Sequence, residues 1–108
     1  MIPSDRDLLL EEEIHEAANW IEKFLEQQTE DTFIADEVIS CAVMYKLQNI
    51  GEAVKRLSEG YKIRKPDVPW KQIAGMRDIL VHDYTKVDRA AVWEAATKNM
   101  PELLENLN

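Results

Sequence analysis

The sequence predicts an all-α fold, an antiparallel up-and-down bundle of four, or four to five, helices. The hydrophobic share is 45%, and the 108 residues include only 3 Gly and 4 Pro. Good helix formers such as Glu, Lys, Leu and Ala recur throughout. Apolar residues repeat at steps of three and four, and no run of β-branched residues indicates a strand. The length favours a single domain over residues 1–108.

The first half of the chain predicts two long helices. Ser4 is expected to cap the first. Its apolar stripe comprises Leu10, Ile14, Ala17, Ile21 and Leu25. After the polar stretch EQQTEDT, the stripe of the second helix comprises Ile39, Val43, Leu47, Ile50, Val54 and Leu57. Gly60 is expected just past the C-terminus of this helix.

The second half predicts two further helices. The segment GYKIRKPDVP has two prolines within four residues and cannot be regular helix. Pro69 suits the first turn of a helix that starts near Trp70. Its stripe comprises Ile73, Met76 and Leu80. Asp88 can cap a fourth helix, and Pro101 is expected to kink or restart it.

Charge is distributed unevenly along the chain. The formal net charge is −8, and residues 1–54 contain 3 Lys or Arg against 13 Asp or Glu. Residues 55–89 contain 9 Lys or Arg against 5 Asp or Glu. The acidic total argues against nonspecific binding of nucleic acid, and solvated surface accounts for part of the basic segment. The clustering of basic residues in this segment could still form a binding surface for a partner that carries phosphate.

Several classes of protein are not indicated. No apolar run approaches the roughly 20 residues of a membrane span, and MIPSDRD does not resemble a signal peptide, so we expect a soluble, cytoplasmic protein without membrane contact. The lone Cys41 is expected to be a buried structural thiol. Glu12 and His15 have the Glu-x-x-His spacing of di-iron bundles, but no second copy exists and Asn19 replaces the second His of a zinc motif. We expect no metal and no cofactor.

The segment MRDILVHDY, residues 76–84, combines an arginine, a histidine and a tyrosine. On a helix, Tyr84 lies within about 20° of Arg77, but His82 lies about 140° away from it. Either the helix unwinds before His82, or a second chain completes the site through a two-fold interface. The alternative is a capped helix end, with Tyr84 packed at its edge and Arg77 paired with Asp78 or Asp83.

This spacing of Arg, four residues, His, one residue and Tyr resembles the signature of HEPN domains. IGEAVKRLSEGYK, PWKQIAGMRDILVHDY and VDRAAVWEAATKNMPELLENL are similar to the HepT-like branch of that superfamily, and the resemblance covers nearly the whole chain. It implies a bundle of four or five helices that forms a homodimer or a higher even oligomer. Many members are ribonuclease toxins of type VII (HepT/MntA) toxin–antitoxin systems.

The resemblance also implies roles for individual residues. Arg77 and His82 become the candidate catalytic pair of an endoribonuclease, and Tyr84 becomes the candidate acceptor of AMP. The partner it implies is an MntA-like minimal nucleotidyltransferase, which neutralises the toxin by attaching AMP to the tyrosine of the motif.

The chemistry suits these side chains. RNA supplies its own nucleophile, the 2′-hydroxyl, so cleavage needs no metal. His82 can transfer protons at neutral pH, and Arg77 can stabilise the charge that grows on the phosphate. Glu52 is expected either to orient Arg77 or to pair with Lys55 or Arg56.

Further side chains and further functions stay open. Trp70 and Tyr61 could stack on bases, or they pack within the fold. A non-catalytic HEPN module that docks with a nucleotidyltransferase, or presents substrate to it, is an alternative function. A purely structural helical oligomer is another.

Overall fold

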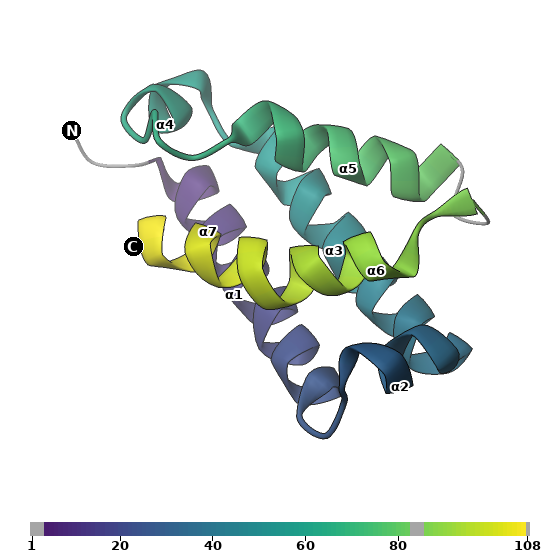
Figure 1. Ribbon diagram of the computed structural model, residues 1–108. Helices are drawn as coiled ribbons and strands as arrows, with labels where there is room; N and C mark the ends of the chain where they lie inside the picture. The colour runs from purple at the N-terminus through teal and green to yellow at the C-terminus, as the bar shows by residue number, and fades with distance from the viewer. Residues whose placement is uncertain (1–3, 83–85, 108) are drawn as a thin grey trace.

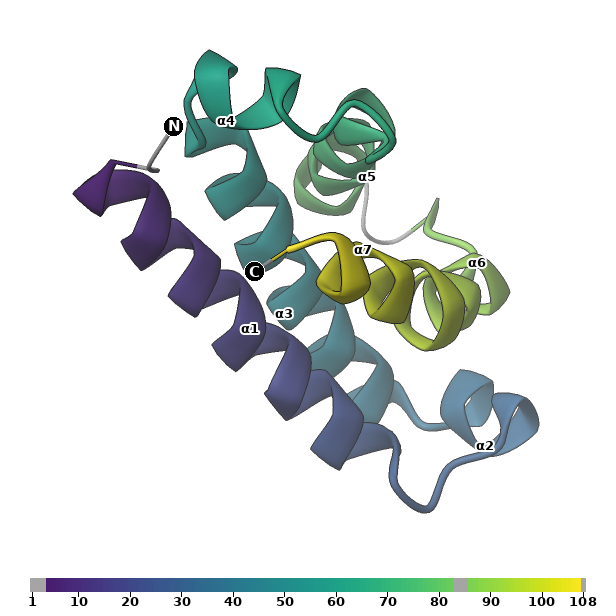
Figure 2. The same cartoon turned by 90° about the vertical axis from the view of Figure 1, so that its left-hand side faces the viewer.

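Two long helices, α1 and α3, form the centre of the fold. The computed structural model describes residues 4–82 and 86–107, and the regular elements within these residues are all helical, as predicted. α1 and α3 run side by side in opposite directions, α5 packs obliquely against α3, and the helical segment from α6 to α7 crosses the pair (Figure 1, Figure 2). The helices are α1 (Asp5–Leu25), α2 (Glu30–Ala35), α3 (Glu37–Arg56), α4 (Glu59–Ile63), α5 (Trp70–His82), α6 (Arg89–Glu94) and α7 (Met100–Asn106), with the π-helical turn η2 (Ala95–Asn99) between the last two.

The first helix follows the sequence prediction closely. The hydroxyl oxygen of Ser4 accepts a hydrogen bond from the backbone N–H of Asp7 at 3.1 Å, so Ser4 is the N-cap of α1. The predicted stripe faces the core. Its buried members are Leu10, Ile14, Ala17 and Ile21, and Leu25 is half-buried.

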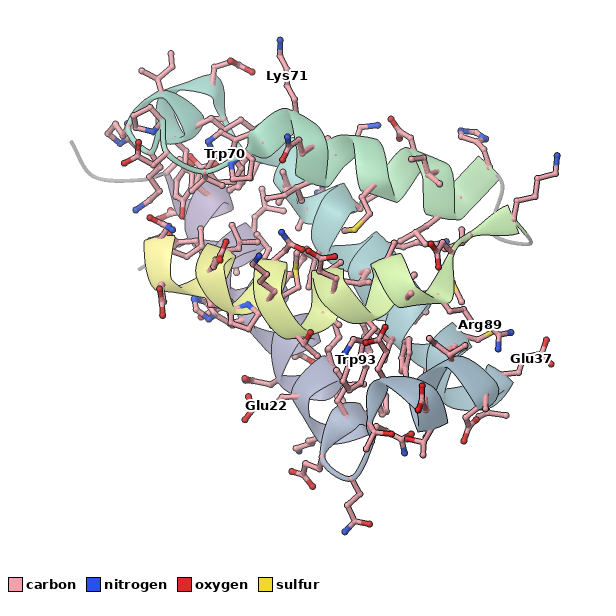
Figure 3. All side chains as sticks on the ribbon, viewed as in Figure 1. Glu22, Glu37, Trp70, Lys71, Arg89 and Trp93 are labelled. Atoms are coloured by element: carbon pink, nitrogen blue, oxygen red, sulfur yellow. The ribbon has the colours of Figure 1, made fainter. Side chains whose placement is uncertain are left out.

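A short helix, α2, replaces the linker that the polar stretch after α1 suggested. Thr29 and Thr32 form a reciprocal capping box at its start. Phe33 anchors it in the core, fully buried, with its ring 5.4 Å from that of Trp93. Figure 3 shows Trp93 reaching from α6 towards α2. Arg89 also donates a hydrogen bond to the carbonyl of Ile34 at 2.7 Å, so α2 is fixed to α6 twice.

The second predicted helix ends earlier than expected. α3 stops at Arg56, and Gly60 lies inside the separate helix α4, so its predicted place beyond the helix end is wrong. The chain leaves α3 at Leu57, which is extended with ψ of 144°. Ser58 then starts α4, because its hydroxyl accepts the N–H of Tyr61 at 3.2 Å.

Buried polar contacts tie α4 to α1. The carboxylate of Asp7, which is 2% exposed, accepts hydrogen bonds from the N–H and hydroxyl of Ser58 at 3.0 and 2.7 Å. The hydroxyl of Tyr61 donates to Glu11, which is also buried. Burial and then this bond raise the pKa of Tyr61 above its usual value.

The two aromatic residues considered as base-stacking groups have packing roles instead. Tyr61 is 1% exposed and lies edge-on to Trp70, with ring centres 6.1 Å apart. The indole of Trp70 donates to the carbonyls of Lys62 and Lys65 at 3.2 and 3.1 Å. Figure 3 shows Trp70 beneath the turn that leads into α5, while Lys71 points away from the bundle.

Cys41 is exposed, so the prediction of a buried thiol is wrong. The apolar stretch around it has one face only, which Val43 and Leu47 turn towards the core. Cys41 lies two residues before Val43, and therefore about 160° away from it around the helix. Ser40 is buried in its place, where its hydroxyl donates to the carbonyl of Phe33 at 2.6 Å.

In the last part of the chain, the helices begin and restart at the residues that the sequence predicted. α5 begins at Trp70, directly after Pro69. Asp88 caps α6 by accepting the N–H of Ala90 at 2.9 Å. Because Pro101 has no N–H to offer to a carbonyl one turn earlier, the helix widens through η2 before α7. The predicted restart of the helix at this proline is confirmed.

Candidate functional site

The candidate site is built on α5, which packs antiparallel against α3. The side-chain amide of Gln48 on α3 donates to the carbonyl of Leu80 at 3.1 Å, which secures the last turn of α5. On the core side, Ile73 and Leu80 are buried. These contacts leave the opposite face of α5 towards solvent.

Arg77 lies where α5 approaches α3 most closely. A β-carbon added to Gly51 would overlap the β-carbon of Arg77 and would lie 2.9 Å from its γ-carbon and 3.4 Å from its α-carbon. Only a glycine at this position of α3 permits the observed spacing. The side chain of Arg77 is therefore pressed against the backbone of α3 and is only 23% exposed.

Two carboxylates hold the guanidinium of Arg77. Its Nη2 lies 2.8 Å from Oε2 of Glu52, and its Nη1 lies 3.2 Å from Oδ1 of Asp78. The hydrogen bond to Glu52, and then that to Asp78, raise the pKa of Arg77. Of the two pairings considered for Glu52, the structure shows the one with Arg77.

Lys55 extends this arrangement by one more charge. Its Nζ lies 3.0 Å from Oδ1 of Asp78, the same oxygen that Arg77 contacts. The hydrogen bond from Lys55, and then that from Arg77, lower the pKa of the Asp78 carboxyl. The four side chains form an ion-pair chain with no net charge. The sequence did not indicate the roles of Gly51 and Lys55, although a glycine within an apolar helical stripe is a signal of close backbone approach.

His82 is exposed on the last turn of α5. Since α5 is helical up to this residue, unwinding before His82, one of the two possibilities that the spacing allowed, is wrong. His82 projects about 140° around the axis from Arg77 and lies about 7.5 Å further along it. The structure therefore does not bring the two side chains together within one chain. Asp83 and Tyr84 lie outside the described residues.

The described residues do not form a metal site or a membrane-spanning helix. Glu12 is exposed on α1, one turn before His15. Within residues 4–82 and 86–107, no three His, Cys, Asp or Glu side chains are grouped so that they could hold a metal ion. In the same part of the chain, no helix is both long and apolar enough to cross a bilayer.

Comparison with known proteins identifies the family of this chain. The family described as "HepT-like: Ribonuclease HepT-like" matches residues 14–108, which include both Arg77 and His82. The chain belongs to the HepT-like ribonuclease family. The resemblance to the HepT-like branch of HEPN domains is thus confirmed.

Named relatives of this HepT-like chain include several proteins described as RNases. The "Probable ribonuclease HepT" of Thermococcus cleftensis is 36% identical over 100 residues, which cover 93% of this chain and 89% of the relative. A "Putative RNase" of Caldanaerobacter subterraneus subsp. tengcongensis is 44% identical over 73 residues, covering 68% and 65% of the two chains.

One relative is a longer protein. The "Gamma-glutamylcyclotransferase and putative RNase" of Methanocaldococcus jannaschii is 36% identical over 94 residues, which cover 87% of this chain but only 42% of the relative. The HepT-like chain therefore spans less than two thirds of this relative and of the Caldanaerobacter protein. No solved structure matches the chain significantly.

Proposed function

We propose that this chain is a metal-independent endoribonuclease that acts on RNA as a dimer, with Arg77 and His82 as its catalytic residues. Membership of the HepT-like family supports an RNA substrate. The observation that carries the proposal is the way Arg77 is held, against Gly51 and between two carboxylates. Such fixation orients a cation before substrate arrives, and preorganised charge is the main source of electrostatic catalysis.

Arg77 retains the capacity to bind a phosphate in this arrangement. A guanidinium has five N–H donors. Glu52 and Asp78 each take one, from Nη2 and Nη1. Nε is buried and has no hydrogen-bond partner. Each terminal nitrogen carries two hydrogens, so each keeps one further hydrogen for a ligand. The two carboxylates orient the guanidinium of Arg77, and its remaining N–H donors can stabilise the negative charge that grows on a phosphate.

His82 supplies the proton transfers in this proposal. The angle of about 140° around the axis of α5 separates His82 from Arg77 of the same chain. A two-fold dimer would bring both copies of each side chain to one cleft. One imidazole then takes the proton of the RNA 2′-hydroxyl, and the other protonates the departing 5′-oxygen. The new bond joins the 2′-oxygen to phosphorus as the bond to the 5′-oxygen breaks. The products are a 2′,3′-cyclic phosphate and a free 5′-hydroxyl.

Control of this activity is assigned to Tyr84. The HEPN resemblance supports an MntA-like minimal nucleotidyltransferase as the partner and AMP as the group that it attaches to the tyrosine. Residues 1–54 contain 13 Asp or Glu against 3 Lys or Arg, and this excess of acidic residues favours a basic protein partner.

The proposal is tested by RNA cleavage in the presence of a metal chelator. We expect the wild-type chain to release products that end in a 2′,3′-cyclic phosphate. Arg77→Ala and His82→Ala are each expected to lose about 100-fold or more of this activity. Arg56→Ala removes an exposed arginine of α3 and serves as the matched control.

Two results would contradict the assignment. Full activity of His82→Ala or Arg77→Ala would exclude the proposed roles. A wild-type chain that binds a nucleotidyltransferase but never cleaves RNA would instead be the non-catalytic module. Intact mass and cleavage assays of the chain produced with and without the nucleotidyltransferase separate these cases.

A further inference from the structure

Two exposed aromatic side chains flank one lysine on the surface shared by α1 and α3. Tyr45 is 60% exposed and Trp20 is 41% exposed. The Nζ of Lys46 lies 5.6 Å from the ring centre of Tyr45 and 5.7 Å from that of Trp20. The ammonium group thus contacts both rings, one from each helix. Trp20 also stacks on Phe24, with ring centres 5.8 Å apart, and the Nζ of Lys23 lies 4.9 Å from its ring centre, yet Trp20 and Tyr45 both keep much of their surface exposed. An exposed group of large apolar side chains can mark a binding site.

The position of Tyr45 relates it to the proposed catalytic arginine. Tyr45 precedes Glu52 by seven residues, so both lie on one face of α3, about 10 Å apart along the axis. Glu52 contacts Arg77 at 2.8 Å. Because α5 runs antiparallel to α3, moving from Glu52 to Tyr45 follows α5 from Arg77 towards His82. Figure 2 shows the α1–α3 pair on which Tyr45 and Trp20 lie.

We propose that Tyr45, Lys46 and Trp20 form a base-stacking subsite for single-stranded RNA beside the proposed catalytic arginine. The inference rests on the proposed ribonuclease function. Single-stranded nucleic acids are bound by aromatic rings on which bases stack, with cations nearby for the phosphates. Stacking accepts any base, so this subsite would position the strand without reading its sequence.

The charges around the subsite set the direction of the strand. A hollow of about 260 Å³ between α1 and α3 is lined by Lys46 and Glu52, and also by Glu13 and Glu16. The last two carboxylates repel phosphate on the α1 side. The sugar–phosphate backbone is therefore expected on the α5 side, near Arg77, with the bases turned towards the rings of α1 and α3.

The test measures binding of an RNA that the wild-type chain cannot cleave. The probe is a single strand of about ten nucleotides with 2′-O-methyl groups, which lacks the nucleophile, and it carries 2-aminopurine to report stacking by fluorescence quenching. We expect Tyr45→Ala to weaken binding about tenfold and to abolish most of the quenching. Tyr45→Phe keeps the ring and is expected to rescue both.

Val38→Ala is the matched control on the same face of α3. Val38 precedes Tyr45 by seven residues and is 79% exposed. If this face instead binds protein, Val38→Ala and Tyr45→Ala will both change the mass in light scattering while RNA binding stays intact, which overturns the subsite. Cleavage by the wild-type chain together with unchanged binding in Tyr45→Ala overturns the subsite alone. A wild-type chain that neither binds nor cleaves RNA overturns the subsite and the proposed function together.

Discussion

The contact between Gly51 and Arg77 joins the stability of the fold to the candidate site. Helical propensity disfavours a glycine inside α3 by about 1 kcal/mol relative to alanine. The close approach of α5 explains its presence, since a β-carbon there would overlap the side chain of Arg77. The same approach holds the guanidinium against α3, within reach of Glu52. A single glycine thus determines where the arginine lies.

Gly51→Ala is expected to destabilise the protein by about 1–3 kcal/mol, because α5 must move away from α3 or Arg77 must change its conformation. Urea unfolding followed by circular dichroism measures the change. Gly75→Ala is the control, because a β-carbon at Gly75 meets no atom within 4 Å. That variant is expected to be neutral or more stable by up to about 1 kcal/mol. A Gly51→Ala protein as stable as the wild type would contradict the packing argument.

At the scale of elements, the sequence predicted the helices whose signals are local. Ser4, Pro69 and Asp88 mark the starts of α1, α5 and α6 through capping or proline geometry, and all three appear in the structure. α2 was missed because its six residues are too few to show a periodic apolar stripe, and only the contact of its buried Phe33 with Trp93 explains it. Gly60 was misplaced because the cap at Ser58 outweighs the tendency of glycine to end helices.

The periodicity of apolar residues in the sequence does not predict contacts between helices that are far apart in the chain. The bond between Asp7 and Ser58 joins residues 51 positions apart, and neither residue belongs to an apolar stripe. At the candidate site, the sequence left the partner of Glu52 open. The pairing of Glu52 with Arg77 depends on the register between α3 and α5, which a helical pattern alone does not determine.

The link between α1 and α4 predicts a dependence of stability on pH. Burial alone would raise the pKa of Asp7, but hydrogen bonds from Ser58 and from Ser4 outweigh it and lower the pKa below the usual 3.8. A lowered pKa means that this carboxylate stabilises the fold above about pH 4. The contribution is lost as the pH falls through the folded-state value.

Asp7→Asn is therefore expected to lower the free energy of unfolding at pH 7 by about 1–3 kcal/mol, because one acceptor of the buried bonds to Ser58 is removed. The difference from the wild type should shrink as the pH falls below 4. Urea unfolding at pH 7 and pH 3 measures both effects. Asp5→Asn, at an exposed position of the same helical turn, is the control. Equal pH dependence in the wild type and Asp7→Asn would contradict this role.

At the scale of the whole molecule, the outer face of α5 has the features of an interface. Ile79 is 61% exposed and Val81 is 41% exposed, and the two residues flank His82 around the helix. Ile79 also lines a groove of about 530 Å³ between α5 and α6, together with Gly75, Met76 and Ala91. A second copy on this face would cover the apolar side chains and place its own motif beside His82.

Ile79→Asp is expected to convert a dimer into a monomer and to abolish RNA cleavage, because a carboxylate would be buried without a partner at the interface. Light scattering at micromolar concentration and the cleavage assay measure the two effects. Leu9→Asp is the matched control, since Leu9 is also 61% exposed but lies on α1. A wild-type chain that is strictly monomeric, or an active Ile79→Asp monomer, would contradict the proposed dimer.

Modification of Tyr84 would affect the proposed dimer through the cleft that is expected to hold Arg77 and His82. The helical wheel of the sequence motif puts Tyr84 within about 20° of Arg77, so we expect an AMP group on its phenol to project towards the arginine. The tethered phosphate would compete with RNA at the high local concentration of an attached ligand, and its negative charge would repel the RNA backbone. Modification is therefore expected to stop cleavage and leave the fold unchanged.

Tyr84→Phe is expected to stay folded and active, and to gain no AMP when it is produced together with the nucleotidyltransferase. Intact mass spectrometry with ATP present detects the added group, and the cleavage assay measures whether the partner still neutralises the chain. Tyr45→Phe, which removes the phenol of an exposed tyrosine on α3, is the matched control and should still be modified. AMP on another residue, or no AMP on the wild-type chain, would contradict the assignment. If Tyr84→Phe is neutralised as well as the wild type, complex formation alone blocks the cleft and the tyrosine is not the point of control.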